Sequence, residues 1–156
     1  MDLSIERREL EPERVLAIEL TTSAERFDAD LSSAFGRIGD VLTAAGAVFA
    51  GPGVCMHPKR RALPGRIAAV VAIPFEGDVE PAADMKVIEL DGGSALVGIL
   101  RGPYDRLPEA WAEMNSSLAK GERPRPKTAP YDRFLRSMVN VVNPDELITE
   151  LVIPLA

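Results

Sequence analysis

Hydrophobic and polar positions follow one pattern twice along the chain, at an offset of 80 residues. Ile73-Pro74 recurs at this offset as Ile153-Pro154, and the apolar run before each Ile-Pro predicts a buried strand. Phe27, Leu31, Ala34 and Ile38 recur as Leu107, Trp111, Met114 and Leu118. Their spacing is that of an apolar stripe on a helix. We therefore expect one supersecondary unit to occur twice.

The first half predicts two strands, a helix and two more strands. The expected elements are strands at 3–10 and 14–20, a helix at about 28–45, and strands near 47–56 and 66–75. Glu11-Pro12-Glu13 separates the first two strands as a turn. Thr22-Ser23-Ala24-Glu25 has the spacing of a capping box at the start of the helix, and Gly46 provides a stop at its end.

The second half predicts the same order of elements after an acidic linker at 77–84. The expected elements are strands at 85–90 and 95–101, a helix from Pro108 to Gly121, and strands near 129–139 and 147–155. Asp91-Gly92 between two such strands is a strong hairpin signal. Pro108 fits the first turn of a helix.

These elements predict a single α+β domain that covers residues 1–156. Repeat 1 spans about 1–76 and repeat 2 about 85–156, as two antiparallel β-β-α-β-β units related by a pseudo-twofold axis. We expect two helices packed on an antiparallel sheet. A duplication also creates a seam between its copies, and small-molecule pockets tend to form at seams between packed elements. We therefore expect a ligand cleft there.

Composition narrows the classes of function. The 156 residues are 46% hydrophobic and 27% charged, which is ordinary for a globular domain. Lys and Arg number 18 against 24 Asp and Glu, so the net charge is −6. Nucleic-acid binding begins with a basic surface, so we expect no direct DNA binding. An acidic surface instead favours the approach of cations.

Compartment and metal chemistry follow from the same composition. Residues 1–8 are charged where a signal peptide would be apolar, and the apolar run 67–75 is too short to span a bilayer. We expect a cytoplasmic protein, because Cys55 has no second cysteine to pair with. Cys55 and His57 are the only Cys and His, so no metal site is expected. A buried thiol beside a strand-end imidazole explains them better than two thirds of a catalytic triad.

Four motifs in chain order carry a resemblance to a known family. They are Gly51-Pro52-Gly53-Val54, Val71-Ala72-Ile73-Pro74, Gly102-Pro103-Tyr104 followed by Leu107 and Trp111, and Asn143-Pro144-Asp145-Glu146-Leu147 followed by residues 149–155, Thr-Glu-Leu-Val-Ile-Pro-Leu. This ordered set resembles GyrI-like small-molecule-binding domains over essentially the whole chain.

The resemblance implies a tandem fold whose ligand cleft lies between the repeats. Such domains are the effector-binding half of AraC- and MerR-type transcription regulators, and they also occur alone. We expect a standalone form, because this chain has no room for a helix-turn-helix. Standalone members include a gyrase-inhibitory protein and some hydrolases. No cofactor is expected, and this includes haem, because His57 is the only histidine and the resemblance is to the non-haem branch.

Glu150 is the strongest candidate site residue. Strand alternation places it on one face with Ile148, Val152 and Pro154, and it is the only charge between Leu147 and Leu155. A carboxylate that loses water on an apolar face is unfavourable unless a cation or hydrogen-bond donors meet it. A lipophilic cation would satisfy it, and the resemblance assigns this role to the acidic residue of the Thr-Glu pair. The alternative is a permanent ion pair with Arg66, Arg133 or Arg136.

Six further residues are candidates for lining the cleft. They are Trp111, Tyr104, Phe134, Tyr131, Met56 and Met138. Aromatic rings can stack on cationic or aromatic ligands, and Met gives an adaptable lining. Core packing is the competing interpretation for the Trp and both Met residues, and a surface position at a strand edge is the competing interpretation for Tyr131.

Three functions therefore compete. The first is a binding or sequestering protein for an amphipathic, cationic small molecule. The second is a small hydrolase, with Glu150 as general base towards water and Tyr104 or Tyr131 as proton donor. The third is inhibition of a partner enzyme such as DNA gyrase, or association with a regulator.

Overall fold

The computed structural model describes residues 1–58, 64–137 and 139–156. Over these residues the chain forms nine β-strands and two α-helices, so the predicted α+β class is confirmed. Every strand pairing within the two compact units is antiparallel. Unit 1 comprises Met1–Glu11 and Gly92–Ala156, and unit 2 comprises Pro12–Asp91. No helix in the described part of the chain is long and apolar enough to cross a membrane.

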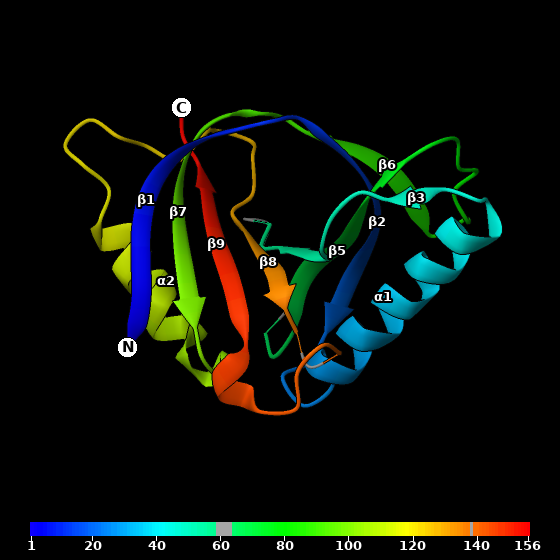
Figure 1. Cartoon of the computed structure of the whole chain (residues 1–156), viewed down its shortest axis with the longest axis horizontal. Helices are drawn as coiled ribbons and strands as arrows, with labels where there is room; N and C mark the ends of the chain where they lie inside the picture. The colour runs from blue at the N-terminus through cyan, green and yellow to red at the C-terminus, as the bar shows by residue number, and fades with distance from the viewer. Residues whose placement is uncertain (59–63, 138) are drawn as a thin grey trace. The chain divides into compact units, whose positions relative to one another are not determined.

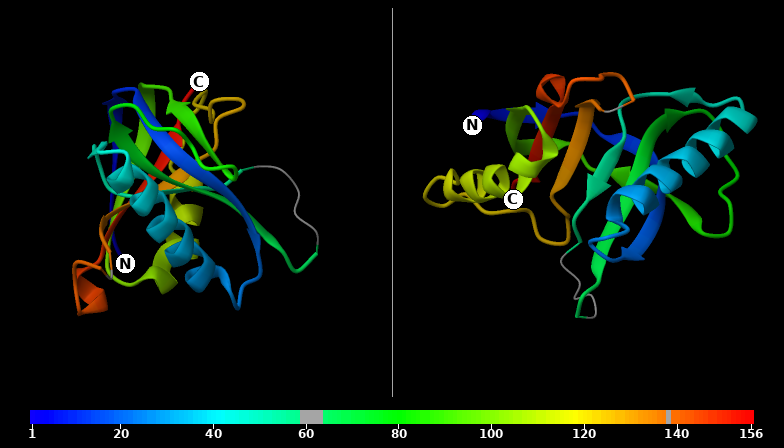
Figure 2. Two further views of the ribbon diagram at one scale, coloured as in Figure 1. Left: turned by 90° about the vertical axis from the view of Figure 1, so that its right-hand side faces the viewer. Right: turned by 90° about the horizontal axis from the view of Figure 1, so that it is seen from below.

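Unit 1 is a four-stranded sheet with one helix on it. Its strands lie in the order β1 (Asp2–Leu10), β7 (Gly93–Arg101), β9 (Ile148–Pro154) and β8 (Tyr131–Arg136) (Figure 1). The 3-10 turns Tyr104–Arg106 and Pro144–Glu146 precede α2 (Leu107–Ser116) and β9, respectively. The right-hand view of Figure 2 shows α2 on one side of these strands.

The core of unit 1 lies between α2 and its sheet. Met114 and Ala110 of α2 pack with Leu96, Leu100 and Leu151. The close approach depends on Gly98 of β7, where a Cβ would lie 2.5 Å from the Met114 Sδ and 3.2 Å from the Leu3 Cδ1. The apolar stripe predicted for this helix is therefore core-facing.

Unit 2 is built in a similar way. Its strands lie in the order β4 (Val54–Met56), β5 (Ile67–Glu76), β2 (Glu13–Thr22) and β6 (Met85–Leu90), while β3 (Val48–Phe49) pairs with the end of β5. The helix α1 (Phe27–Ala44) buries Ala34, Ile38 and Leu42 against Val71 and Ile73.

The predicted hairpin at Asp91-Gly92 is wrong, and the two strands on either side of Glu11-Pro12-Glu13 do not pair with each other either. β1 pairs with β7 and not with β2, and β6 pairs with β2 and not with β7. The Asp91-Gly92 connection is therefore no hairpin turn, because both edges of β7 are taken by β1 and β9. The first strand of each predicted repeat belongs to the sheet of the other compact unit. The pseudo-twofold repeat itself stays a prediction.

Three local predictions also need correction. Thr22 makes no capping box, since its hydroxyl donates to Asp30 Oδ2 at 2.6 Å and α1 starts only at Phe27. The strand expected at 47–56 is split into β3 and β4 around residues 51–53. The helix expected to reach Gly121 ends at Ser116, where Ser116 and Ser117 donate to carbonyls four residues earlier. Pro108 in the first turn and Gly46 after α1, at φ 70°, are confirmed.

Candidate functional site

Glu150 lies on the face of the unit 1 sheet opposite to α2, which we call the helix-free face. Its neighbour Leu151 packs in the core with α2, and successive side chains of a strand point to opposite faces. In the register of the sheet, Glu150 stands between Ile99 of β7 and Arg133 of β8. The alternation predicted from the sequence is therefore confirmed for this residue.

The Glu150 carboxylate is buried and already partnered. Arg8 of β1 donates from Nη1 to Glu150 Oε2 at 2.8 Å, and the Arg133 Nε lies 3.9 Å from Glu150 Oε1. Arg8 also donates from Nη2 to Glu6 Oε1 at 2.6 Å. These hydrogen bonds to Glu150 and then to Glu6 raise the pKa of Arg8 above its ordinary value. The guanidinium therefore stays charged at any physiological pH.

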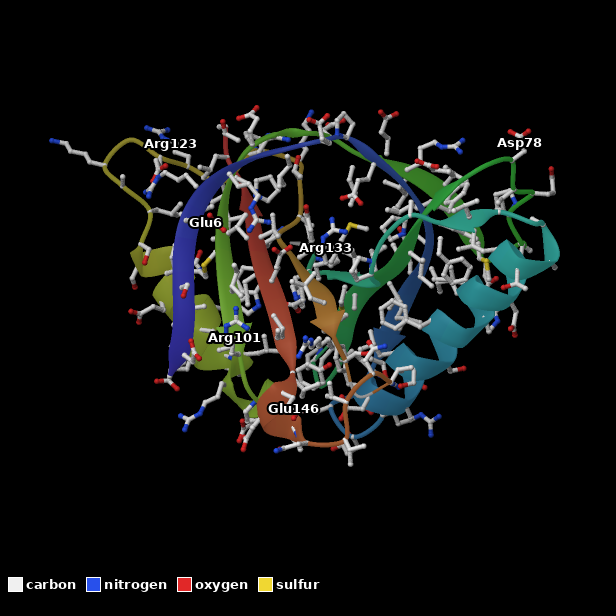
Figure 3. All side chains as sticks on the ribbon, in the orientation of Figure 1. Glu6, Asp78, Arg101, Arg123, Arg133 and Glu146 are labelled. Atoms are coloured by element: carbon white, nitrogen blue, oxygen red, sulfur yellow. The ribbon has the colours of Figure 1, made fainter. Side chains whose placement is uncertain are left out.

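Glu6, Arg8, Arg133 and Glu150 form a group that we call the charge cluster. Figure 3 labels Glu6 on β1 and Arg133 on β8. Two carboxylates and two guanidinium groups make the cluster neutral as a whole. Val97 and Val152, which face each other across β7 and β9, are buried apolar residues beside it, 0% and 2% exposed.

Tyr131 shares the helix-free face with the charge cluster. It stands opposite Val152 in the sheet and is buried. The Arg133 guanidinium lies 5.7 Å from the centre of its ring, within reach of a cation–π contact. An aromatic ring, two arginines and a carboxylate thus lie along one sheet face.

The other aromatic candidates lie on the helix side of the same sheet. Phe134 stands opposite Thr149 in the register, and Thr149 precedes Glu150, so Phe134 points to the face that α2 covers. Tyr104 packs edge-on against Phe134 with ring centres 5.9 Å apart. Trp111 of α2 donates from its indole Nε1 to Asp132 Oδ1 at 2.9 Å.

The structure thus brings together only part of the predicted site. Glu150 and Tyr131 lie on one face of the unit 1 sheet, whereas Trp111, Tyr104 and Phe134 lie on the other. Met56 belongs to unit 2, where it is buried on β4 opposite Val70. Met138 lies outside the described residues. The ligand roles of all these residues stay predictions.

Of the three arginines expected near Glu150, the structure places Arg133 close to it, and it adds Arg8, which the sequence did not single out. The alternation of Leu3 and Ile5 with Ser4, Glu6 and Arg8 was a local signal that Arg8 faces away from the helix. The sequence did not indicate that β1 pairs with β7, which lies some 90 residues further along the chain. Only this pairing carries Arg8 to β9.

Metal ligation has no support in the described part of the chain. No group of three or more His, Cys, Asp or Glu side chains there is arranged to hold a metal ion. Cys55 is a buried thiol on β4, and His57 follows at the end of that strand.

Comparison with solved structures gives the same fold in several proteins. The EcmrR C-terminal domain superposes with a TM-score of 0.84 at 15% identity, covering 100% of this chain and 99% of that one. In the EcmrR–DNA complex the match has a TM-score of 0.82 at 15% identity and covers 98% of this chain but 57% of the EcmrR chain. The chain therefore spans little more than half of that protein.

Two further neighbours differ in what they do. SAV2435, solved bound to tetraphenylphosphonium, matches with a TM-score of 0.60 at 15% identity, covering 98% of this chain and 94% of that one. A hydrolase encoded by lin2189 from Listeria innocua matches with a TM-score of 0.64 at 14% identity, covering 97% and 91%. A search of curated proteins found no match. Residues 3–156 match the model of one family, and the chain belongs to the GyrI-like small molecule binding domain family.

Proposed function

We propose that this domain binds an amphipathic, cationic small molecule on the helix-free face of unit 1, with Glu150 as its counter-charge. The observation that carries the proposal is a buried carboxylate at the centre of a sheet face whose nearest strand neighbours include Ile99 and Val152. A cation with apolar substituents gains from contact with the partly exposed Ile99 and from attraction to the carboxylate. Tyr131 adds an aromatic ring on the same face.

The fold itself does not require a charge at this position. In unit 2, β5 carries Val70 where β9 carries Glu150, each one residue before the core residues that face the helix. A sheet of this type therefore forms with a hydrophobic residue there. A carboxylate that the fold can do without is more readily explained by binding than by packing.

The relatives support the class of ligand. Tetraphenylphosphonium, bound in SAV2435, is a cation whose charge is enclosed by four phenyl groups. It combines the two properties that the helix-free face favours, a positive charge and a large apolar surface. At 15% identity that protein shares the fold, and the transfer of its ligand class to this chain is part of our proposal.

The test is a calorimetric titration with tetraphenylphosphonium, compared with its anionic isostere tetraphenylborate. We expect the phosphonium to bind and the borate, which has the same shape but the opposite charge, to bind more weakly. Glu150→Gln keeps the size of the side chain and removes the charge. It should weaken phosphonium binding by about tenfold or more, as expected when a charge-assisted contact is lost.

Glu113→Gln provides the matched control. It removes the same charge from the exposed surface of α2, on the opposite side of the unit 1 sheet, and should leave the affinity within about twofold. Each variant is first shown by circular dichroism and urea unfolding to be folded. Equal affinities of wild type and Glu150→Gln for the phosphonium would refute a role for the carboxylate.

A hydrolase is the second candidate, favoured by the neighbour from Listeria innocua. The geometry supports it less well, because the Arg8 hydrogen bond occupies an oxygen of Glu150 that a general base would need. Tyr104 packs against Phe134 on the helix side, so Tyr131 is the phenol that shares a face with Glu150. Recovery of a bound cationic ester unchanged after long incubation would favour binding, whereas multiple turnover that Glu150→Gln abolishes would favour hydrolysis.

A further inference from the structure

In the charge cluster, the carboxylate proposed to bind a ligand cation already has positively charged partners. An incoming cation meets a carboxylate that Arg8 already holds through a 2.8 Å hydrogen bond. With Arg133 also near, Glu150 has two positive neighbours. Any cation that binds Glu150 must therefore compete with charges that belong to the protein.

The members of the charge cluster differ in how easily they can move. The side chains of Glu150 and Arg133 are 10% and 12% exposed, whereas that of Arg8 is 35% exposed and that of Glu6 is 52% exposed. Arg8 thus connects a buried carboxylate to one that solvent reaches. It is the arginine that can leave Glu150 with the smaller loss of packing.

Glu6 provides Arg8 with a second carboxylate to which it can stay bound. Arg8 binds the two carboxylates through different nitrogens, Nη1 to Glu150 and Nη2 to Glu6. If a ligand cation takes Glu150, Arg8 keeps its hydrogen bond to Glu6, and water can reach the guanidinium nitrogen that is released. No charge is then left buried and unpaired, which is the most costly outcome of breaking an ion pair.

We propose that Arg8 is an internal counterion that competes with cationic ligands for Glu150 and thereby sets their affinity, with Glu6 holding Arg8 when the ligand is bound. This inference rests on the proposed function of Glu150. It explains how a carboxylate that pairs with the protein's own arginine can also serve a ligand cation. It also makes Arg8 a specificity-determining residue, since only a cation that gains enough from apolar contact displaces it.

The test is the affinity for tetraphenylphosphonium in Arg8→Gln. Removing the competitor leaves Glu150 beside Arg133 alone, so binding should tighten by about threefold to tenfold, the range expected for one partly exposed ion pair. Arg7→Gln is the control, because it removes the same charge from the next residue of β1, which stands opposite the core residue Leu96. It should change the affinity by less than about twofold.

A double variant separates competition from a structural effect. In the Glu150→Gln background, Arg8→Gln should no longer tighten binding, because the contested carboxylate is gone. Urea unfolding of each variant confirms that all are folded.

The outcomes are distinct. If wild type binds the phosphonium and Arg8→Gln binds equally or more weakly, competition by Arg8 is refuted while the proposed site stands. If Arg8→Gln tightens binding by the same factor in the wild-type and Glu150→Gln backgrounds, Arg8 acts on the net charge and the inference is also refuted. If neither wild type nor Arg8→Gln binds, the proposed function fails and the inference fails with it.

Discussion

β5 of unit 2 and β9 of unit 1 are alike on the side that faces a helix and different on the other. Both strands lie between two others of their own sheet, and both contain an Ile-Pro pair near their end. On the helix side, Val71, Ile73 and Phe75 of β5 pack with α1. Leu151 and Ile153 of β9, and Leu155 directly after it, lie in the α2 core. The positions that pack against a helix are therefore apolar in both units.

The helix-free sides carry different chemistry. Val70 of β5 stands between Glu19 of β2 and Met56 of β4, whereas Glu150 of β9 stands between Ile99 and Arg133. The charge lies on the central strand in unit 1 and on a neighbouring strand in unit 2. Glu19 is exposed and pairs with Lys86 at 2.9 Å, as a surface residue does.

The edge strands β1 and β6 also differ in the residues on their helix-free sides. β1 presents Glu6 and Arg8 on the helix-free face, whereas the matching residues of β6 are Lys86 and Ile88. One sheet design therefore accepts either a charge cluster around a buried carboxylate or a largely apolar surface. The fold therefore depends on the residues of the helix side, whereas the residues of the helix-free side can differ between the two units.

The largest effect should come from breaking the shared helix side. Ile153→Ala in unit 1 and Ile73→Ala in unit 2 each empty a buried core position, and we expect each to lower the free energy of unfolding by about 2–5 kcal/mol. Urea denaturation measures both. Val142→Ala, at a residue that is 94% exposed, should stay within about 0.5 kcal/mol. A loss below about 1 kcal/mol at one of the two isoleucines would show that the helix sides are not equivalent.

A smaller effect should follow from moving the charge to unit 2. Val70→Glu places a carboxylate on a half-buried position opposite Glu19, with no arginine in the place of Arg133. Desolvation and like-charge repulsion should lower the free energy of unfolding by about 1–3 kcal/mol. Val70→Gln has the same size without the charge and should lower it less.

Restoring a cation would sharpen this prediction. Ile88→Arg adds to β6 the residue type that β1 carries at Arg8, and in the Val70→Glu background it should recover part of the lost stability. Urea denaturation of the single and double variants gives the coupling between the two positions. If Val70→Glu and Val70→Gln are equally stable, the charge is tolerated without partners, and the charge cluster of unit 1 needs no special explanation.

The sequence predicted what is local. The period of two along β9 placed Glu150 on the face opposite to Leu151, and the strand 85–90 has the bounds that were expected. The same alternation in Tyr131-Asp132-Arg133-Phe134 places Tyr131 and Phe134 on opposite faces of the sheet. The alternation therefore contradicts the prediction that all the aromatic candidates line one cleft.

The sequence did not predict what depends on distant pairing. The turn residues Asp91-Gly92 favour a hairpin by themselves, yet β6 and β7 each find other partners in the sheet. The preference of these two residues for a hairpin turn is local, and the pairing of whole strands outweighs it. Because β1 crosses to β7, the partner of Glu150 comes from the start of the chain, and no local pattern indicates this.

The smallest effect concerns the edge strands and depends on pH. Arg7 of β1 donates to both carboxylate oxygens of Glu122, from Nε at 2.8 Å and from Nη2 at 2.5 Å. These hydrogen bonds, with one from the backbone N–H of Ala119, lower the pKa of Glu122 from 4.5 to about 2. The matching residue of β6 is Val87, which is 41% exposed and has no charge to offer.

The sign of the effect follows from the lowered pKa. The folded state binds the proton of Glu122 more weakly than the unfolded state, so its contribution to stability is complete above pH 4.5 and is lost as the pH falls towards about 2. The difference in unfolding free energy between wild type and Glu122→Gln should therefore shrink over this range. Urea denaturation from about pH 6 to about pH 2.5 measures it. In an Arg7→Gln background the same substitution should show a much weaker pH dependence, and an unchanged dependence there would mean that Arg7 is not its cause.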